Sequence, residues 1–223
     1  MQTANTVGTV NSKESLAAAL GLPRGAVDLF ELRLDAFAET SSTLLENVPR
    51  LKAPLLITVR HFREGGQVSL TASRRAALYE NFIPYAALID VELSSMKSLE
   101  SVLKKARSSG LKIVASVHDF KATPRPERLA LLARTAAGSG ADVFKVATLT
   151  KTPGDVAVLL SLFERSKLPL SVMGMGRLGK ASRLLFAQAG SVLNYGFLDV
   201  NAKVSGQWPA KLLKQRIAEL TAA

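Results

Sequence analysis

The sequence predicts a (β/α)8 barrel, also called a TIM barrel, built as one α/β domain over residues 1–223. Two observations lead to this fold class: eight short apolar runs recur along the chain, and helix-like segments lie between them. That number of strands in 223 residues is typical of the barrel. An open, doubly wound sheet is the alternative. It usually has fewer strands, however, and no G-x-G-x-x-G motif follows the first run.

The apolar runs are rich in Val, Ile, Leu and Ala, as expected for parallel strands that are buried on both faces. None approaches the roughly 18 residues of a membrane-spanning helix. Each is therefore interpreted as one strand of a soluble barrel. The predicted strands cover residues 6–10, 26–34, 54–60, 87–93, 112–120, 142–149, 168–176 and 191–198.

Several of the intervening segments carry signals for where a helix begins or ends. Asn11 is expected to cap the first helix, because Glu14 follows it at capping-box spacing. Pro126 stands where the first turn of another helix is expected, and Gly110 stands where a helix should end. The helices predicted from these signals and from apolar spacing are 11–20, 98–110, 125–140 and 208–220.

Composition narrows the class of protein further. The chain has no cysteine, which excludes disulfides and thiolate metal sites and fits a reducing compartment. Its N-terminus has neither a basic nor an apolar leader region, so we expect a cytoplasmic protein. The net charge of +11 fits an anionic substrate. Because the cations are spread along the chain, we expect neither a nucleic-acid nor a membrane partner.

Charged and polar side chains share one face of the predicted strands. In "DLFELRLDAF", Glu31, Arg33 and Asp35 alternate with Leu32 and Leu34. In a barrel, the leucines would contact helices and the charges would point inward. Other strands place their polar residues late, toward the C-terminal mouth, where barrel enzymes keep their sites. The inward groups predicted there are Thr58 with Arg60, Asp90 with Glu92, Ser116 with His118, Val143 with Lys145 and Ala147, and Ser171 with Met173 and Met175.

Lys145 and His118 are the candidates for catalysis. A lysine in an apolar strand is costly unless it is paired, and nearby cations with partial burial would make it a nucleophilic amine. Its alternative role is a structural salt bridge with an inward carboxylate. His118 ends the preceding strand, where a neutral imidazole could shuttle protons for imine chemistry. Its alternative role is that of a hydrogen-bonded core histidine.

The remaining signals are less specific. Arg33, Arg60 and Arg183 could clamp an anionic, hydroxylated substrate, or could pair with Glu31, Glu64 or Asp35 instead. The glycines of "GMGRLG" at 174–179 resemble a phosphate loop but also suit a tight turn. With His61 as the other histidine and few acidic clusters, no metal site is predicted.

Six segments, each at the end of a predicted strand, together resemble the type I 3-dehydroquinate dehydratase family of the shikimate pathway. They occur in the family's order over most of the chain. The resemblance implies a (β/α)8 barrel, a homodimer, no metal or organic cofactor, and 3-dehydroquinate as substrate. The segments are "ELRLD" (31–35), "TVRHFREGG" (58–66), "SVHDF" (116–120), "FKVAT" (144–148), "VMGMGRLGKASR" (172–183) and "SGQ" (205–207).

The resemblance also implies catalytic roles. Lys145 matches the lysine that forms an imine with the C3 ketone of the substrate. His118 matches the histidine that removes the C2 proton and later protonates the leaving C1 hydroxyl. Glu64 matches the glutamate that orients this histidine. A protonated imine is a better electron sink than a ketone, which explains why the reaction uses a lysine.

The substrate contacts follow from the same resemblance. Arg183 matches the arginine that pairs with the substrate carboxylate, and Gln207 matches a glutamine on the closing loop. The residues that match hydroxyl contacts are Glu31, Arg33 and Arg60, and those that match apolar walls are Met173 and Met175. The closing loop departs from the family pattern at Lys203, Val204 and Ser205. Arg183 already supplies the charge, so Lys203 is expected to face solvent.

Two other functions are consistent with the residues. One is a different class I aldolase-type lyase, which would use the same lysine chemistry on another keto substrate. The other is a basic, non-catalytic binding protein on a barrel scaffold, which would not need Lys145 and His118 on adjacent strands. Turnover of 3-dehydroquinate separates both from the dehydratase.

Overall fold

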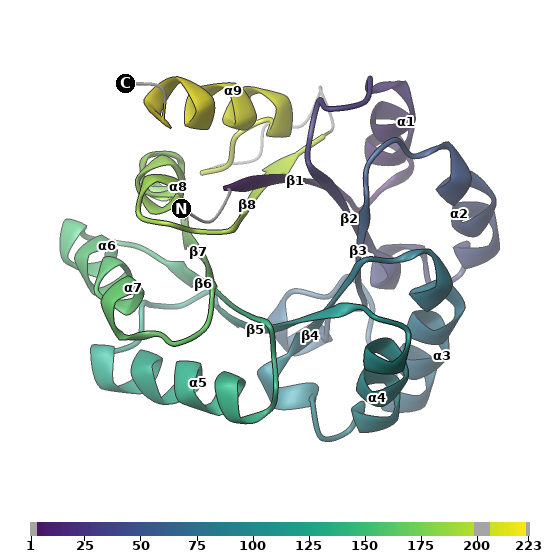
Figure 1. The fold of residues 1–223 in the computed structure, drawn as a ribbon, viewed down its shortest axis with the longest axis horizontal. Coiled ribbons are helices and arrows are strands. Elements are labelled where there is room, and N and C mark those ends of the chain that lie inside the picture. Colours follow the sequence, from purple (N-terminus) through teal and green to yellow (C-terminus); the bar gives the residue numbers. More distant parts are fainter. Residues whose placement is uncertain (1–3, 199–205, 222–223) are drawn as a thin grey trace.

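The computed structural model describes residues 4–198 and 206–221, which form a (β/α)8 barrel (Figure 1). Eight parallel strands follow one another around the barrel in the order β7-β6-β5-β4-β3-β2-β1-β8. The predicted fold class is therefore confirmed, and the open doubly wound sheet is excluded. The strands are β1 (Asn5–Val10), β2 (Leu29–Arg33), β3 (Leu55–Thr58), β4 (Leu88–Glu92), β5 (Lys112–Asp119), β6 (Val143–Leu149), β7 (Leu170–Met175) and β8 (Leu193–Phe197).

The seam between β7 and β8 nearly closes the barrel without a regular ladder. The Val192 N–H donates to the Leu170 carbonyl over 2.8 Å. The Ser171 hydroxyl donates to the Leu193 carbonyl over 2.7 Å. The buried Ser171 hydroxyl thus donates the hydrogen bond that a backbone N–H would donate in a regular ladder. This bond helps to hold the two strands together at the seam.

Helices surround the strands on the outside of the barrel (Figure 1). None of those in the described ranges is long and apolar enough to cross a membrane. The helices are α1 (Lys13–Gly21), α2 (Ser41–Asn47), α3 (Ala72–Phe82), α4 (Glu100–Ser108), α5 (Pro126–Gly138), α6 (Pro153–Leu160), α7 (Leu162–Arg165), α8 (Gly179–Gln188) and α9 (Ala210–Thr221).

The helix signals in the sequence were correct with one exception. Pro126 is the first residue of α5, and Gly110 follows α4 with a φ of 79°. The cap of α1 is Ser12 rather than Asn11, and Ser15 rather than Glu14 completes the capping box. The Ser15 hydroxyl accepts a hydrogen bond from the Ser12 N–H over 2.9 Å. Serine thus takes the capping-box role that was predicted for the longer side chain of Glu14.

The alternation of each strand separates an outer part of the core from an inner part, and a smaller third cluster of Ala187, Leu213 and Ile217 lies between α8 and α9. Leu32 and Leu34 belong to the outer part, between strands and helices, as predicted. The inner part fills the barrel near the start of its strands with residues such as Leu29, Leu56 and Val114. The barrel is therefore plugged by apolar side chains at its N-terminal end. The charged residues that line the cavity lie at the C-terminal end.

Candidate active site

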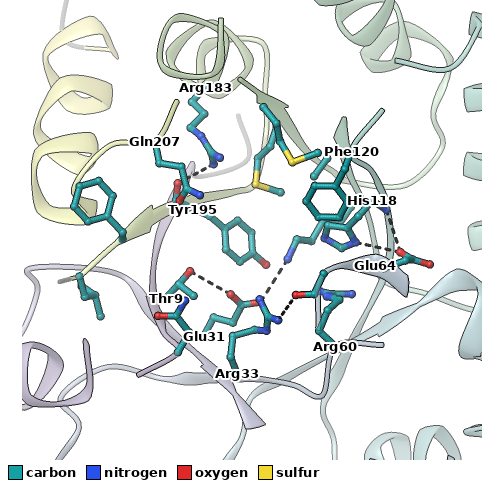
Figure 2. A pocket seen from close by; sticks show the side chains of 18 of the residues that line it. Thr9, Glu31, Arg33, Arg60, Glu64, His118, Phe120, Arg183, Tyr195 and Gln207 are labelled. Atoms are coloured by element: carbon teal, nitrogen blue, oxygen red, sulfur yellow. Dashed lines mark hydrogen bonds and ion pairs between the residues drawn. The ribbon is translucent and has the colours of Figure 1, made fainter. Parts of the chain in front are cut away.

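A cavity of about 380 Å³ opens at the C-terminal mouth of the barrel (Figure 2). Every predicted site residue lines it, although these residues come from six strands or the loops and helices that follow them. They are Lys145, His118, Glu64, Glu31, Arg33, Arg60, Arg183, Gln207, Met173 and Met175. The two methionines supply apolar wall, and Met173 is buried.

Lys145 lies deep in this cavity with only 3% of its surface exposed. Its Nζ lies 2.8 Å from Asp90 Oδ2 and 3.5 Å from Glu31 Oε1. The same ammonium lies 3.8 Å from the centre of the Tyr195 ring. Two carboxylates and an aromatic face stabilise a cation here. The salt bridge considered as the alternative for Lys145 is thus present, in a position that still faces the cavity.

Arg60 holds the carboxylates of β4 in place. Its Nη2 lies 2.9 Å from Asp90 Oδ1, and its Nη1 lies 3.0 Å from Glu92 Oε1. Burial opposes the charge on Asp90, but Arg60 and Lys145 outweigh it and hold the pKa of that carboxyl well below its usual range. Because each buried charge has an opposite partner, the cluster avoids the penalty of an isolated buried ion.

Arg75 extends this charge cluster to the outer side of the barrel. It lies on α3 and is buried, and its Nη2 forms a short ion pair with Glu92. The same guanidinium donates to the Val59 carbonyl over 2.7 Å and to Ser95 Oγ over 2.9 Å. A helix outside the barrel thereby fixes a carboxylate that in turn fixes Arg60.

His118 and Glu64 form a second pair beside Lys145. Glu64 Oε2 lies 3.2 Å from His118 Nδ1 and accepts from the His118 backbone N–H over 3.0 Å. Its other oxygen accepts from Ser94 Oγ over 2.9 Å. Burial, with Arg60 and Lys145 nearby, holds the pKa of His118 well below its usual value, so its imidazole is neutral at pH 7. Burial raises the pKa of Glu64.

The third charge predicted to face inward, Asp35, does not line the cavity. Strand β2 ends at Arg33, and the chain then turns into a 3₁₀ helix, η1 (Leu34–Phe37). Asp35 is fully buried there and pairs with Arg33 at 2.9 Å. It also accepts from the Arg60 and Gln67 backbone N–H groups, each over 3.0 Å. Asp35 therefore supports Arg33, while Glu31 and Arg33 face the cavity.

Arg183 is a buried cation without a carboxylate partner among the described residues. Its Nη1 donates to the Tyr195 carbonyl over 2.9 Å, and its Nε has no partner there. Burial alone lowers the pKa of Arg183 to about 10. The ion pair considered for Arg183 with Glu31, Glu64 or Asp35 is absent from these ranges. The cavity thus contains an available positive charge.

The segment 174–179 forms the turn from β7 into α8. Gly176 has a φ of 80°, which favours glycine. A Cβ on Gly179 would lie 2.4 Å from the Gly206 carbonyl, so only a glycine lets these two backbones approach. This contact places Gln207 beside the cavity. The predictions for Lys203, Val204 and Ser205 lie outside the described residues.

Sequence reasoning missed two functional candidates. Asp90 was predicted to point inward, but no role followed because the alternation does not tell which cation it meets. Tyr195 went unnoticed in "SVLNYGFL", although the period of two would have placed it on one face with Leu193 and Phe197. No group of three or more acidic or histidine side chains in the described ranges could hold a metal.

Comparison with known proteins supplies the family. The family model described as type I 3-dehydroquinase matches residues 6–221. A 3-dehydroquinate dehydratase from Methanocella arvoryzae is 32% identical over 193 residues, covering 86% of each chain.

Two solved structures agree with this result over almost the whole chain. The type I 3-dehydroquinate dehydratase of Clostridium difficile has a TM-score of 0.86 at 26% identity, covering 99% of this chain and 94% of that one. The 3-dehydroquinate dehydratase of Geobacillus kaustophilus has a TM-score of 0.86 at 29% identity, covering 99% and 92%. The chain therefore belongs to the type I 3-dehydroquinase family and is an enzyme with 3-dehydroquinate dehydratase activity.

Proposed function

We propose that the chain converts 3-dehydroquinate to 3-dehydroshikimate and water through an imine between Lys145 and the C3 ketone. One observation carries this mechanism: the buried Lys145 ammonium faces a polar cavity beside a neutral histidine. The solved structure of the Clostridium difficile enzyme is one with covalently modified comenic acid, which supports a covalent mechanism.

Imine formation requires no reactant beyond the lysine and the ketone. The ammonium first loses a proton, and the amine then attacks C3 while the carbonyl π electrons move to oxygen. Two of the three ammonium protons leave with that oxygen as water, and the third remains on the positively charged imine. Asp90 and Glu31 lie within 3.5 Å of Lys145 Nζ and would stabilise this cation as they stabilise the ammonium.

His118 would carry the protons of the later steps. As a neutral imidazole it can accept the C2 proton, and the electron pair of that C–H bond then forms the enamine. The protonated histidine can return the proton to the C1 hydroxyl, which leaves as water while the enamine electrons form the C1–C2 double bond and regenerate the positively charged imine. Glu64 holds Nδ1 at 3.2 Å and would fix the tautomer and the orientation of the ring. Hydrolysis of the product imine restores Lys145.

The charges of the cavity fit the polar groups of the substrate. Arg183 would offer the carboxylate its Nε, which has no partner among the described residues, and Gln207 lies on the same side of the cavity (Figure 2). Glu31, Arg33 and Arg60 lie on the opposite side and would contact the ring hydroxyls. Met173 and Met175 would cover the apolar face of the ring.

Borohydride trapping tests the imine. Reduction in the presence of 3-dehydroquinate should add the mass of the reduced ligand to the peptide that contains Lys145 and should abolish activity. Lys145→Gln should acquire no mass. The nearby Lys151 is exposed and is the matched control, so Lys151→Gln should still be labelled. Labelling at Lys151, or no labelling of an active enzyme, contradicts the mechanism.

We also propose three further properties of the chain. A single catalytic domain over 1–223 is supported by the family match to residues 6–221. A homodimer is supported by the resemblance to the family alone, and light scattering during gel filtration tests it. Cytoplasmic location is supported by the lack of cysteine, and fractionation of cells tests it.

A further inference from the structure

The Tyr195 hydroxyl is a buried polar group without a partner in the part of the chain that the structure describes. Tyr195 lies on β8 with 5% of its surface exposed, and its Oη makes no hydrogen bond within the described ranges. Only two other buried side-chain atoms there share this state, Thr6 Oγ1 and Arg183 Nε. Tyr195 and Arg183 line the active-site cavity, whereas Thr6 does not. Buried polar groups are nearly always satisfied, so these two exceptions in the cavity lining are candidates for contacts with a substrate.

Tyr195 is placed against the proposed nucleophile. Its ring points from β8 into the middle of the cavity (Figure 2), and Lys145 Nζ lies 3.8 Å from the ring centre. The hydroxyl belongs to that same ring and lies in the cavity lining with Lys145, so it is near the place where the amine would attack a bound ketone. An oxygen on the carbon that Lys145 attacks would therefore lie next to the Tyr195 hydroxyl.

We propose that Tyr195 is a further catalytic residue, whose hydroxyl donates a hydrogen bond to the oxygen on C3 of the substrate while Lys145 attacks that carbon. The inference rests on the imine mechanism proposed above. During attack, the carbonyl π electrons move to this oxygen, and the phenol stabilises the charge that develops there. The Tyr195 proton stays on its own oxygen, so the atom balance of imine formation is unchanged.

The charges around Tyr195 are consistent with a donor that keeps its proton. Burial, Glu31 and Asp90 raise the pKa of its phenol well above the usual value, while Arg60 acts in the opposite direction. The hydroxyl is thus protonated throughout the working pH range. In the free enzyme no acceptor competes for it among the described residues, so the donor is available when the substrate arrives.

The variant Tyr195→Phe tests this role because it keeps the ring and its contact with Lys145. Since the hydroxyl makes no hydrogen bond with residues 4–198 and 206–221 in the free enzyme, the melting temperature of this variant should be equal or higher. The rate of imine formation, measured by rapid-quench borohydride trapping, should fall about fivefold to tenfold, the effect of one hydrogen bond. The matched control is Tyr79→Phe. The Tyr79 hydroxyl donates to the Asp90 carbonyl over 2.6 Å and accepts from the Val59 N–H over 2.9 Å, so that variant should melt at a lower temperature.

Two results would overturn the inference. One is an unchanged rate of imine formation in Tyr195→Phe when the wild-type enzyme is trapped normally. The other is a loss of stability in Tyr195→Phe as large as that in Tyr79→Phe, which would mean that the hydroxyl serves the fold. If the wild-type enzyme itself is not trapped at Lys145, the imine mechanism fails instead. The two failures are therefore distinguishable.

Discussion

The Lys145 ammonium and the Asp90 carboxylate lie 2.8 Å apart, with 4% and 0% of their side-chain surfaces exposed. They stand on β6 and β4, with β5 between them. Because another strand separates β4 from β6, the two side chains meet across the inside of the barrel. This ion pair therefore contributes to the stability of the barrel and also holds the proposed nucleophile, Lys145.

Replacing Asp90 by Asn should destabilise the protein strongly. The change keeps the shape but leaves Lys145 and Arg60 with less opposite charge, and breaking a buried pair typically costs about 3–5 kcal/mol. Urea unfolding followed by circular dichroism measures this loss. Glu100→Gln, which removes an exposed pair with Lys104, should leave the unfolding midpoint unchanged. Equal shifts of the unfolding midpoint in the two variants would show that the buried ion pair stabilises the protein no more than the exposed pair does.

Ser94→Ala should slow proton transfer without weakening substrate binding. Ser94 donates to Glu64 Oε1 but does not line the cavity, so it acts through Glu64 on His118. We expect kcat to fall about twofold to tenfold while KM and trapping at Lys145 stay unchanged. Steady-state kinetics with 3-dehydroquinate measures this split. Ser98→Ala is the control, because Ser98 donates only to the Ser95 carbonyl. A rise in KM alone would assign Ser94 to binding instead.

Arg183→Met should bind substrate poorly yet fold at least as well as the natural chain. The charge of Arg183 is desolvated and has no carboxylate partner in the described ranges, so removing it relieves a cost. We expect KM to rise about tenfold to a hundredfold, because a hydrogen-bonded charge on the carboxylate is lost. Calorimetry and kinetics together measure the two effects. Arg216→Met, on the surface, should change neither. A lower melting temperature with unchanged KM would make Arg183 structural.

The acid limb of kcat/KM should lie well below pH 6.5. His118 must be neutral to accept a proton, and its folded pKa is lowered, so activity is lost only as pH falls through that lowered value. The free energy of unfolding should also decrease as pH falls. The unfolded chain binds a proton near pH 6.5 and the folded chain does not, so stability decreases as pH falls below about 6.5. His61→Gln should leave the acid limb in place. A limb at or above pH 6.5 would contradict the assignment to His118.

The sequence by itself determined the barrel and, except at Asp35, the face of the residues that line the cavity. Alternation in "DLFELRLDAF" separated Glu31 and Arg33 from Leu32 and Leu34, and the structure has all four on the predicted faces. This worked because a parallel strand in a barrel has only two sides, and the period of two is a local property of the chain.

Only the tertiary structure decided which charges meet. Lys145 and Asp90 are 55 residues apart, and the stagger of the strands places them at the same height in the cavity. The alternation shows which face of the strand a residue occupies, but it does not show the position of that residue along the barrel axis. Asp35 leaves the inward face because β2 ends two residues earlier, at Arg33, where the chain turns. Among the described residues the Tyr195 hydroxyl has no hydrogen-bond partner, and this depends on all neighbouring strands at once, because it is a property of the whole packed site.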